Sequence, residues 1–211
     1  WSQAHFDAMR PLMKMLADAG QRAITTTLLY EPWGGQTEDY YLSMITRMRR
    51  VDGSWTYDYT VFDRWVELMT GLGIDRTINC YSMLPWNNEL HYRDGSTGRF
   101  VDVTADPGTP AFEALWEPFL TDFTGHLREK GWLGRTNIAI DERSPEEMTD
   151  ALGLLRKTAP ELGIAMADNK NSYLNYPFIN SMCVKVRDRV PPQHIAERRA
   201  QGFITTYYVC C

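Results

Sequence analysis

The clearest structural signal in the chain is the stretch Asn137-Ile138-Ala139-Ile140-Asp141-Glu142-Arg143. A short apolar run leads into two adjacent carboxylates and a cation, which predicts a buried strand that ends at the acids. The residues that follow, Ser144-Pro145-Glu146-Glu147, predict a helix start: serine is a favoured N-cap, proline a favoured first residue, and acids stabilise the positive end of the helix dipole. The carboxylates are therefore expected at a strand-to-helix junction, where β/α proteins usually build active sites.

Two adjacent acids at such a junction suggest chemistry. Successive strand residues point to opposite faces, but the frayed end of a strand twists enough for both side chains to face one cleft. A carboxyl group in apolar or anionic surroundings can act as a general acid, whereas one that stays ionised can orient or stabilise a partner. A structural alternative stays open: Asp141 caps the helix, and Glu142 pairs with Arg143 or Arg135.

The composition indicates a globular protein. The chain has 211 residues, of which 44% are hydrophobic and 23% charged, so it can bury a core and is not disordered by composition. The net charge is −5 and the basic residues are dispersed, which argues against a nucleic-acid partner. Seven Trp and eleven Tyr are more than a plain core requires, and sugar faces stack on such rings.

The four cysteines, Cys80, Cys183, Cys210 and Cys211, have neither zinc-finger spacing nor the pattern of a disulfide framework. We therefore expect neither a disulfide framework nor a metal site. No apolar run reaches the roughly 18–20 residues that span a bilayer. The chain opens on Trp1 and not on Met, which is compatible with a targeting segment that has been removed.

Strand-like segments alternate with amphipathic helices along the chain. The expected strands are 24–30, 76–82, the strand before Glu142, 163–168, 181–186 and 203–209. The expected helices are 5–19, 61–72, 111–131, 145–158 and 191–201. Between them we expect a short helix at 40–50, a hairpin at 51–59 and a long loop at 83–110.

This alternation predicts an α/β fold with a parallel sheet. The long loops follow strands while the helix-to-strand turns are short, so functional loops gather at the carboxyl ends of the strands, as in a barrel. Six strands do not close an eight-stranded barrel. We therefore expect residues 1–211 to form a single TIM-type (β/α)8 barrel domain of about six β/α units, truncated at both ends, with its first and last strands missing.

Two loop residues have competing interpretations. Trp33 lies beside Gly34-Gly35 just after a strand, which suits either a ligand-binding lip or a packed cover. His91 is expected to be a surface residue of the loop, because neither an Asp nor a second His stands near it in a recognisable pattern.

Five groups of residues, taken in order, carry a family resemblance. They are His5-Phe6-Asp7-Ala8-Met9-Arg10-Pro11, Pro32-Trp33 with Gln36-Thr37, Ile78-Asn79-Cys80-Tyr81-Ser82-Met83 with Pro85-Trp86, Ile140-Asp141-Glu142-Arg143, and Thr205-Thr206-Tyr207-Tyr208 with Cys210-Cys211. In this order and spacing they resemble glycoside hydrolase family 123, the bacterial β-N-acetylgalactosaminidases, over nearly the whole chain. The resemblance implies a (β/α)8 barrel with its active site after the fourth strand, which is the Asp-Glu strand if one strand precedes Trp1.

The resemblance also implies a reaction. It would be the retaining, exo-acting release of terminal β-linked N-acetylgalactosamine, with the sugar's 2-acetamido oxygen as the nucleophile. Glu142 would be the general acid and base, and Asp141 would orient and stabilise the acetamido group. Such substrate-assisted catalysis suits adjacent carboxylates, which are poorly placed to flank a bond from both sides.

Further site residues follow from the same resemblance. Aromatic side chains at or just past strand ends would form the sugar pocket, and an amide would bond a sugar hydroxyl: Trp33, Tyr81, Trp86, Tyr207, Tyr208 and Asn169. A tyrosine hydroxyl would bond the acetamido oxygen. Core packing is the alternative for each ring.

The implied partner is a glycan or glycoconjugate, with neither nucleic acid nor a membrane span. By analogy, the protein would be exported to the periplasm or cell surface of a bacterium. The alternative from another functional class is a non-catalytic carbohydrate-binding barrel or an inactive glycosidase fragment.

Overall fold

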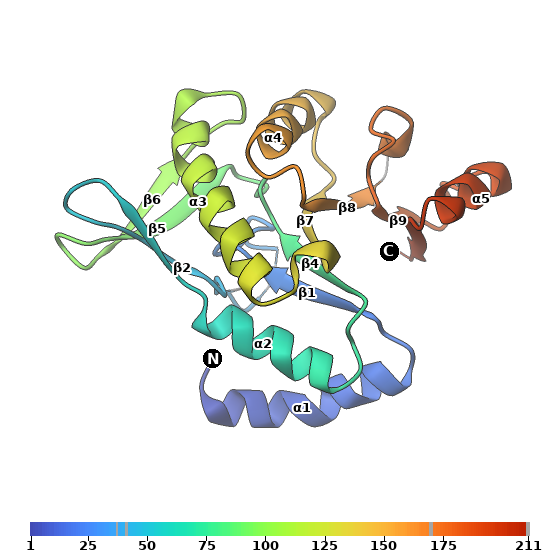
Figure 1. Ribbon diagram of the computed structural model, residues 1–211, viewed down its shortest axis with the longest axis horizontal. Helices are drawn as coiled ribbons and strands as arrows, with labels where there is room; N and C mark the ends of the chain where they lie inside the picture. Colours follow the sequence, from blue (N-terminus) through green and yellow to red (C-terminus); the bar gives the residue numbers. More distant parts are fainter. Residues whose placement is uncertain (37, 41, 169–170, 210–211) are drawn as a thin grey trace. The chain divides into compact units, whose positions relative to one another are not determined.

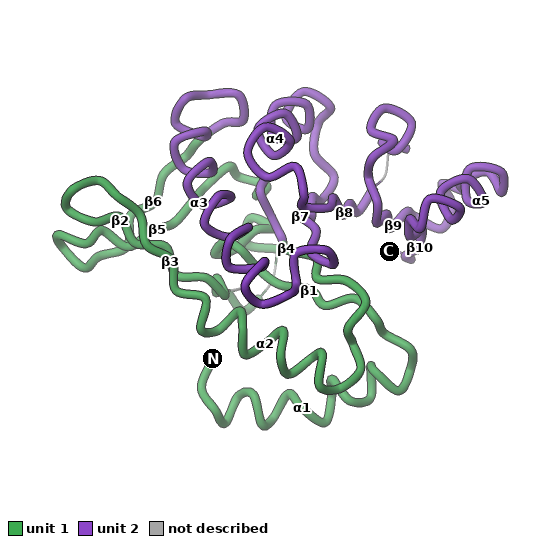
Figure 2. Tube along the Cα trace, in the orientation of Figure 1, with its two compact units in different colours: residues 1–80, 85–105 green, residues 81–84, 106–211 purple. Residues whose placement is uncertain are grey.

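The computed structural model describes residues 1–36, 38–40, 42–168 and 171–209 (Figure 1). The chain divides into two compact units (Figure 2). Unit 1 comprises Trp1–Cys80 and Pro85–Ala105, and unit 2 comprises Tyr81–Leu84 and Asp106–Cys211. The prediction of a single domain over the whole chain stays a prediction beside this division.

Unit 1 combines β/α elements with a small mixed sheet, in which β2 and β5 are parallel and the two outer pairs are antiparallel. Its helices and strands are α1 (Gln3–Asp18), β1 (Ala23–Thr27), β2 (Thr46–Arg49), β3 (Trp55–Asp58), α2 (Thr60–Gly71), β4 (Thr77–Tyr81, whose last residue belongs to unit 2), β5 (Glu89–Asp94) and β6 (Phe100–Thr104). In α2 the apolar residues recur at helical spacing, so Phe62, Val66 and Met69 are buried. The Trp65 indole N–H donates to the Thr25 carbonyl at 2.9 Å, which fixes α2 on β1.

Two sequence-based predictions in unit 1 are wrong. Residues 46–49 form strand β2 and not part of a helix, because their backbone pairs with β3 on one side and β5 on the other. The stretch 83–110 is not a simple loop, because β5 and β6 form an antiparallel hairpin within it. The pairing of β2 with β5 joins segments that lie far apart in the sequence, which local periodicity does not record. The β5–β6 hairpin is local, and its signal is the short turn that contains Gly95 and Gly98.

Unit 2 is a parallel β/α sheet. Its helices and strands are α3 (Pro110–Glu129), η1 (Leu133–Arg135), β7 (Thr136–Asp141), α4 (Pro145–Thr158), β8 (Gly163–Asp168), η2 (Ser172–Leu174), β9 (Ser181–Lys185), α5 (Pro192–Ala200) and β10 (Ile204–Tyr208). The strands pair in the order β7-β8-β9-β10, all parallel. Their carboxyl ends therefore share one edge.

The core of unit 2 follows from its apolar patterns. The first five residues of β7 are buried, as the apolar run predicts. Phe112, Trp116, Phe119 and Phe123 form a buried stripe along α3, which lies beside α4 in Figure 1. The predicted strands and long helices are confirmed within a few residues at each end, and the mixed α/β class is confirmed with them.

The amino edge of this sheet is closed by polar side chains. The Asn180 amide donates to Asn137 Oδ1 at 2.9 Å, and Asn180 Oδ1 accepts the Ile164 N–H at 2.8 Å. Asn137 is only 2% exposed, so these bonds satisfy a polar group that burial would otherwise penalise. A Cβ at Gly163 would lie 2.0 Å from Asn137 Oδ1, so only glycine fits between the two amides.

Candidate active site at the carboxyl edge of unit 2

Each of the four parallel strands of unit 2 ends on an ionisable residue. These residues are Asp141 on β7, Asp168 on β8, Lys185 on β9 and Tyr208 on β10. The parallel registers place Asp141 opposite Ala167 and Tyr208 opposite Lys185. Unit 2 therefore collects titratable groups at the edge where β/α enzymes position their chemistry.

Glu142 is aimed by an unusual backbone conformation. It follows the last residue of β7 with φ of 46°, in the left-handed region that non-glycine residues rarely adopt. Its N–H still donates to the Ala167 carbonyl at 3.2 Å, so the residue stays attached to β8. This departure from strand geometry frees the side chain of Glu142 from the in-and-out alternation that would separate it from Asp141.

The Glu142 carboxylate is held by two donors from neighbouring strands. The Tyr208 hydroxyl donates to Glu142 Oε1 at 2.7 Å, and Lys185 Nζ lies 3.5 Å from the same oxygen. The side chains of Lys185 and Glu142 are 20% and 25% exposed, so the group is partly shielded yet open to a ligand. Tyr208 was predicted to bind substrate, and in the structure it is hydrogen-bonded to Glu142, the predicted catalytic residue.

The turn after the carboxylates is fixed by a capping box. The Ser144 hydroxyl accepts the Glu147 N–H, and the Glu147 carboxylate accepts the Ser144 N–H at 3.1 Å. Arg143 forms an ion pair with Glu147. The structure therefore contradicts the structural alternative from the sequence, because Ser144 is the cap and Glu142 bonds Tyr208 and Lys185.

The contacts of Glu147 in the capping box keep its carboxylate ionised. Burial alone would raise the pKa of Glu147, but the hydrogen bonds from Ser144 and the charge of Arg143 bring it below its usual value. The carboxylate thus stays ionised where it closes the first turn of α4, just beyond Asp141 and Glu142.

Tyr81 lies in the electrostatic field of this edge. Burial and then the charge of Asp141 raise the pKa of Tyr81. Its hydroxyl therefore stays protonated at neutral pH and can donate a hydrogen bond. Tyr81 and Asp141, both predicted site residues, are thus close enough to interact.

Tyr207 is placed differently. Successive residues of β10 point to opposite faces, so Tyr207 lies on the face opposite to Tyr208. It acts electrostatically on Tyr173, whose hydroxyl bonds His194 Nδ1 at 2.8 Å. The structure does not bring Tyr207 to Glu142, and its substrate-binding role stays a prediction. Asn169 lies outside the described residues.

Asp168 is fully buried and serves the loop after β8. It accepts the Ser172 N–H at 2.6 Å and the Ser172 hydroxyl at 3.0 Å. These bonds fix the start of the η2 turn. The carboxylate thus has a structural task, in contrast to the partly exposed Glu142.

Trp33 and Trp86 belong to unit 1. The Trp86 N–H donates to the Pro32 carbonyl at 3.1 Å, so the two tryptophan loops are joined. Trp33 lines a cavity of about 730 Å³ together with Trp65 and Tyr40. Their predicted contact with sugar stays a prediction.

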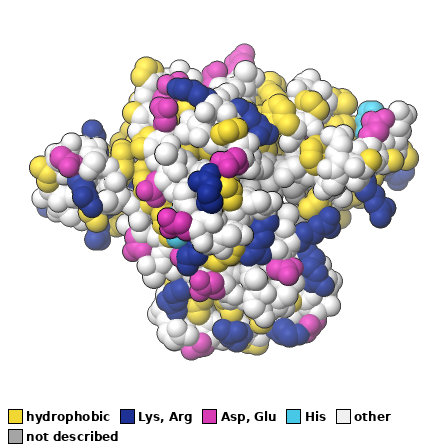
Figure 3. All heavy atoms as spheres, viewed as in Figure 1, with side chains coloured by type: hydrophobic (Ala, Val, Ile, Leu, Met, Phe, Trp, Pro, Cys, Tyr) yellow, Lys and Arg dark blue, Asp and Glu magenta, His cyan; other side chains and the backbone are white. Residues whose placement is uncertain are grey.

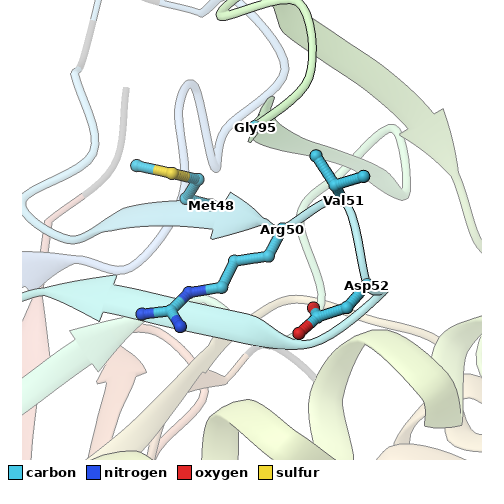
Figure 4. A pocket seen from close by; sticks show the side chains of 5 residues that line it. All are labelled: Met48, Arg50, Val51, Asp52 and Gly95. Carbon is cyan, nitrogen blue, oxygen red and sulfur yellow. The ribbon is translucent and has the colours of Figure 1, made fainter.

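Unit 1 contains further hollows. One of about 470 Å³ lies at the turn after β2, where Arg50, Val51 and Asp52 border it with Met48 and Gly95 (Figure 4). Val51 is 82% exposed there, as expected for a hairpin turn. None of the predicted site residues that the structure describes lines this hollow.

A second hollow of unit 1, of about 480 Å³, corrects the interpretation of His91. His91 Nδ1 lies 2.5 Å from Asp102 Oδ1, and the two residues are cross-strand partners on β5 and β6. The prediction that His91 is a loop residue without a nearby Asp is therefore wrong. Arg47 also borders this hollow, and burial lowers its pKa to about 10.

Sequence reasoning missed Lys185. The period-two pattern of 181–186 predicts a strand and so places Lys185 on the same face as Cys183. That pattern gives no indication of a carboxylate partner 43 residues earlier in the chain, because a lysine that ends a strand usually faces solvent.

Charged side chains of both signs are mixed on the surface that Figure 3 shows, where Lys and Arg side chains are interspersed with Asp and Glu. Among the described residues, no group of three or more His, Cys, Asp or Glu side chains is placed to hold a metal ion. Within that part of the chain, no helix is long and apolar enough to cross a membrane.

The parallel β/α sheet and its carboxylate edge define a class of enzyme in which acids at strand ends act on bound substrate, as in many glycosidases. The family model of the glycoside hydrolase 123 catalytic domain matches residues 1–211. The chain belongs to glycoside hydrolase family 123. The family resemblance seen in the sequence is thereby confirmed.

A solved structure agrees with this assignment. It is a family 123 glycoside hydrolase from Clostridium perfringens, described in connection with glycolipid glycan hydrolysis. The identity is 29% and the TM-score 0.90, and the match covers 99% of this chain. The chain spans 39% of the length of that relative. No curated protein matches the chain.

Proposed function

We propose that the chain carries out the exo-acting, retaining hydrolysis of terminal β-linked N-acetylgalactosamine by substrate-assisted catalysis. The observation that carries the proposal is the geometry of Glu142, whose carboxylate is turned out of the strand beside Asp141 and held by Tyr208 and Lys185. Membership of glycoside hydrolase family 123 supplies the reaction class. The specific sugar and the nucleophile are the proposed part.

In this mechanism Glu142 gives a proton to the glycosidic oxygen as the bond to C1 breaks. The acetamido oxygen of the same sugar attacks C1 and forms an oxazoline-like intermediate. Glu142, now a carboxylate, takes a proton from the water that opens this ring. Because the nucleophile comes from the substrate, a second carboxylate about 5 Å away across the scissile bond is not needed.

Asp141 would accept a hydrogen bond from the acetamido N–H. Its charge would orient the acetamido oxygen toward C1 and stabilise the positive charge of the intermediate. The neutral hydroxyl of Tyr81, next to Asp141, is suited to donate to the acetamido oxygen. No step in this scheme requires a metal or cofactor.

The proposal extends to architecture and location. We propose that the β/α elements belong to a (β/α)8 barrel, with Trp33 and Trp86 at the sugar site. We also propose that the natural partner is a glycan or glycoconjugate and that the protein is exported in a bacterium. The family membership and the match with the Clostridium perfringens enzyme support this reading.

The test is hydrolysis of methyl and aryl β-N-acetylgalactosaminides by the parent protein, Glu142→Gln and the control Glu146→Gln. Glu146 undergoes the same chemical change at an exposed position in the first turn of α4. We expect Glu142→Gln to lose about 10²–10⁴-fold in kcat/KM on the methyl glycoside, which needs a general acid, and the control to keep the parent rate.

Full activity in Glu142→Gln would refute the assignment of the general acid. Equal turnover of a substrate that lacks the 2-acetamido group would refute substrate assistance. Binding of N-acetylgalactosamine without turnover by the parent would favour the alternative, a non-catalytic carbohydrate-binding barrel.

A further inference from the structure

We propose that Tyr208 and Lys185 are positioning residues that hold Glu142 by one oxygen, Oε1, and so assign proton transfer to the other oxygen, Oε2. The inference rests on the proposed role of Glu142 as general acid and base. It gives Tyr208 a different task from the sugar contact expected from the sequence.

Both contacts converge on the same atom. The Tyr208 hydroxyl is 2.7 Å from Glu142 Oε1, and Lys185 Nζ is 3.5 Å from it. Tyr208 and Lys185 are partners in register on β10 and β9, and each is the last residue of its strand. The backbone ladder therefore fixes the two donors relative to each other and fixes the oxygen that they share.

The chemistry of a carboxyl group then distinguishes its two oxygens. When Glu142 carries a proton, the oxygen that accepts the Tyr208 hydrogen bond is the carbonyl oxygen, so the proton lies on Oε2. When Glu142 is ionised, Oε1 still accepts the same bond. Tyr208 thus keeps its contact through both halves of the reaction and never competes for the transferred proton.

Lys185 acts on the charge that the reaction creates. As Glu142 releases its proton to the leaving group, negative charge develops on the carboxylate 3.5 Å from the ammonium group. An interaction that strengthens as this charge grows stabilises the transition state more than the bound substrate. Lys185 therefore favours leaving-group departure without touching the sugar.

The contacts also restrain a side chain whose backbone is strained. Glu142 has φ of 46°, and a side chain on such a backbone is productive only if its orientation is maintained. One hydrogen bond and one ion pair, both from strand-end residues, supply that restraint. Loss of the Tyr208 or the Lys185 contact should leave substrate affinity unchanged, but the Glu142 carboxyl group would no longer be aligned to transfer its proton to the leaving group.

The experiment measures kcat/KM on two substrates that differ only in the leaving group, methyl and 2,4-dinitrophenyl β-N-acetylgalactosaminide. The proteins are the parent, Tyr208→Phe, Lys185→Met, Lys185→Arg and the control Tyr173→Phe. The control loses a tyrosine hydroxyl that bonds His194 at 2.8 Å and leaves Glu142 untouched.

We expect Tyr208→Phe to lose about 10- to 100-fold on the methyl glycoside and less than about 3-fold on the dinitrophenyl glycoside, because only the poor leaving group needs an aligned acid. Lys185→Met should also lose more kcat/KM on the methyl glycoside than on the dinitrophenyl glycoside, with a smaller loss than Tyr208→Phe. Lys185→Arg should regain most of the kcat/KM that Lys185→Met loses. KM should hardly change in any of these variants. In Tyr173→Phe, kcat/KM should change by the same factor on both substrates.

An equal loss on both substrates, or a higher KM alone, would show that Tyr208 binds sugar and would overturn the inference. Crystal structures of the parent and Tyr208→Phe give a readout that does not depend on turnover. An unmoved Glu142 side chain in Tyr208→Phe would overturn the inference even if the proposed reaction is wrong. A displaced side chain would support the inference on its own.

Discussion

The two edges of the parallel sheet of unit 2 are built in opposite ways from the same strands. At the amino edge, Asn137 and Asn180 are tied by a 2.9 Å hydrogen bond that leaves room only for Gly163. At the carboxyl edge, Asp141 and Glu142 bring two adjacent carboxyl groups to a strand end, Glu142 lies beside the partly exposed Lys185, and the backbone of Glu142 is strained. At the amino edge the buried amides are hydrogen-bonded to each other, whereas the carboxyl edge is partly exposed and carries the proposed catalytic residues.

This difference shows how a β/α protein separates stability from chemistry. Polar groups at the amino edge bond one another, so they fix the register of β7, β8 and β9. The carboxyl edge uses that fixed register to bring Asp141, Lys185 and Tyr208 to one side. Substitutions at one edge should therefore alter folding, and substitutions at the other should alter catalysis.

The largest effect that tests this separation is expected from Asp141→Asn. Loss of the charge that we propose orients and stabilises the acetamido group should reduce kcat about 10²- to 10³-fold. The unfolding temperature should stay close to that of the parent. Steady-state kinetics on an aryl glycoside, together with calorimetry of the same preparation, would measure both quantities.

A fall in unfolding temperature that accounts for the lost activity would show that Asp141 is structural, and the contrast between the edges would fail. Asp122→Asn is a suitable control, because it makes the same change at an exposed position in α3. Its kcat should match that of the parent.

The reverse outcome is expected from Gly163→Ala. The new Cβ would stand 2.0 Å from Asn137 Oδ1 and 2.5 Å from Asn180 Nδ2, so the bond between the amides must break or shift. The free energy of unfolding should fall by about 1–3 kcal/mol, since buried polar groups lose partners. Denaturant titration would measure this, and kcat of the folded fraction should be unchanged.

Gly153→Ala in α4 is the matched control, because a Cβ there meets no atom within 4 Å. Replacement of an exposed helical glycine should raise stability by about 0.5–1 kcal/mol. If Gly163→Ala and Gly153→Ala changed the free energy of unfolding equally, the close fit around Gly163 would not contribute to stability.

The smallest effect is expected from Ser144→Ala, which removes the cap that joins the carboxyl edge to α4. The loss should be about 1 kcal/mol of unfolding free energy at neutral pH. The pKa of Glu147 lies below its usual value in the folded protein, so its contacts add stability above the ordinary glutamate range and lose it as pH falls through the folded pKa.

The deficit of Ser144→Ala should therefore shrink as the pH falls through the lowered pKa of Glu147 in the folded protein, because below it Glu147 is protonated in both proteins. Thermal unfolding of parent and variant across this pH range is the measurement. If the loss of stability in Ser144→Ala stayed constant with pH, the contribution of the Ser144 cap would not depend on the charge of Glu147.

Much of unit 2 was predictable because its signals are local. The apolar run before Asp141 predicted β7, and the sequence Ser144-Pro145 predicted the start of α4. The pairing of β2 with β5 was not predictable in this way, since Met48 and Arg93 lie far apart in the sequence. Propensity alone does not report such non-local pairing.

The site shows the same limit. Adjacency of Asp141 and Glu142 is visible in the sequence, and their position at a strand end is confirmed. The partners of Glu142 come from two strands that follow 43 and 66 residues later, and only the parallel registers bring them together. Local periodicity cannot specify which strand ends become neighbours.

The left-handed backbone at Glu142 has a consequence for protein engineering. Glycine, and after it asparagine, tolerates φ of 46° better than glutamate does. A selection for thermal stability alone would thus favour either residue at position 142 and enrich stable proteins that lack the proposed general acid. Libraries built on this scaffold should keep position 142 fixed, or be screened for turnover at every round.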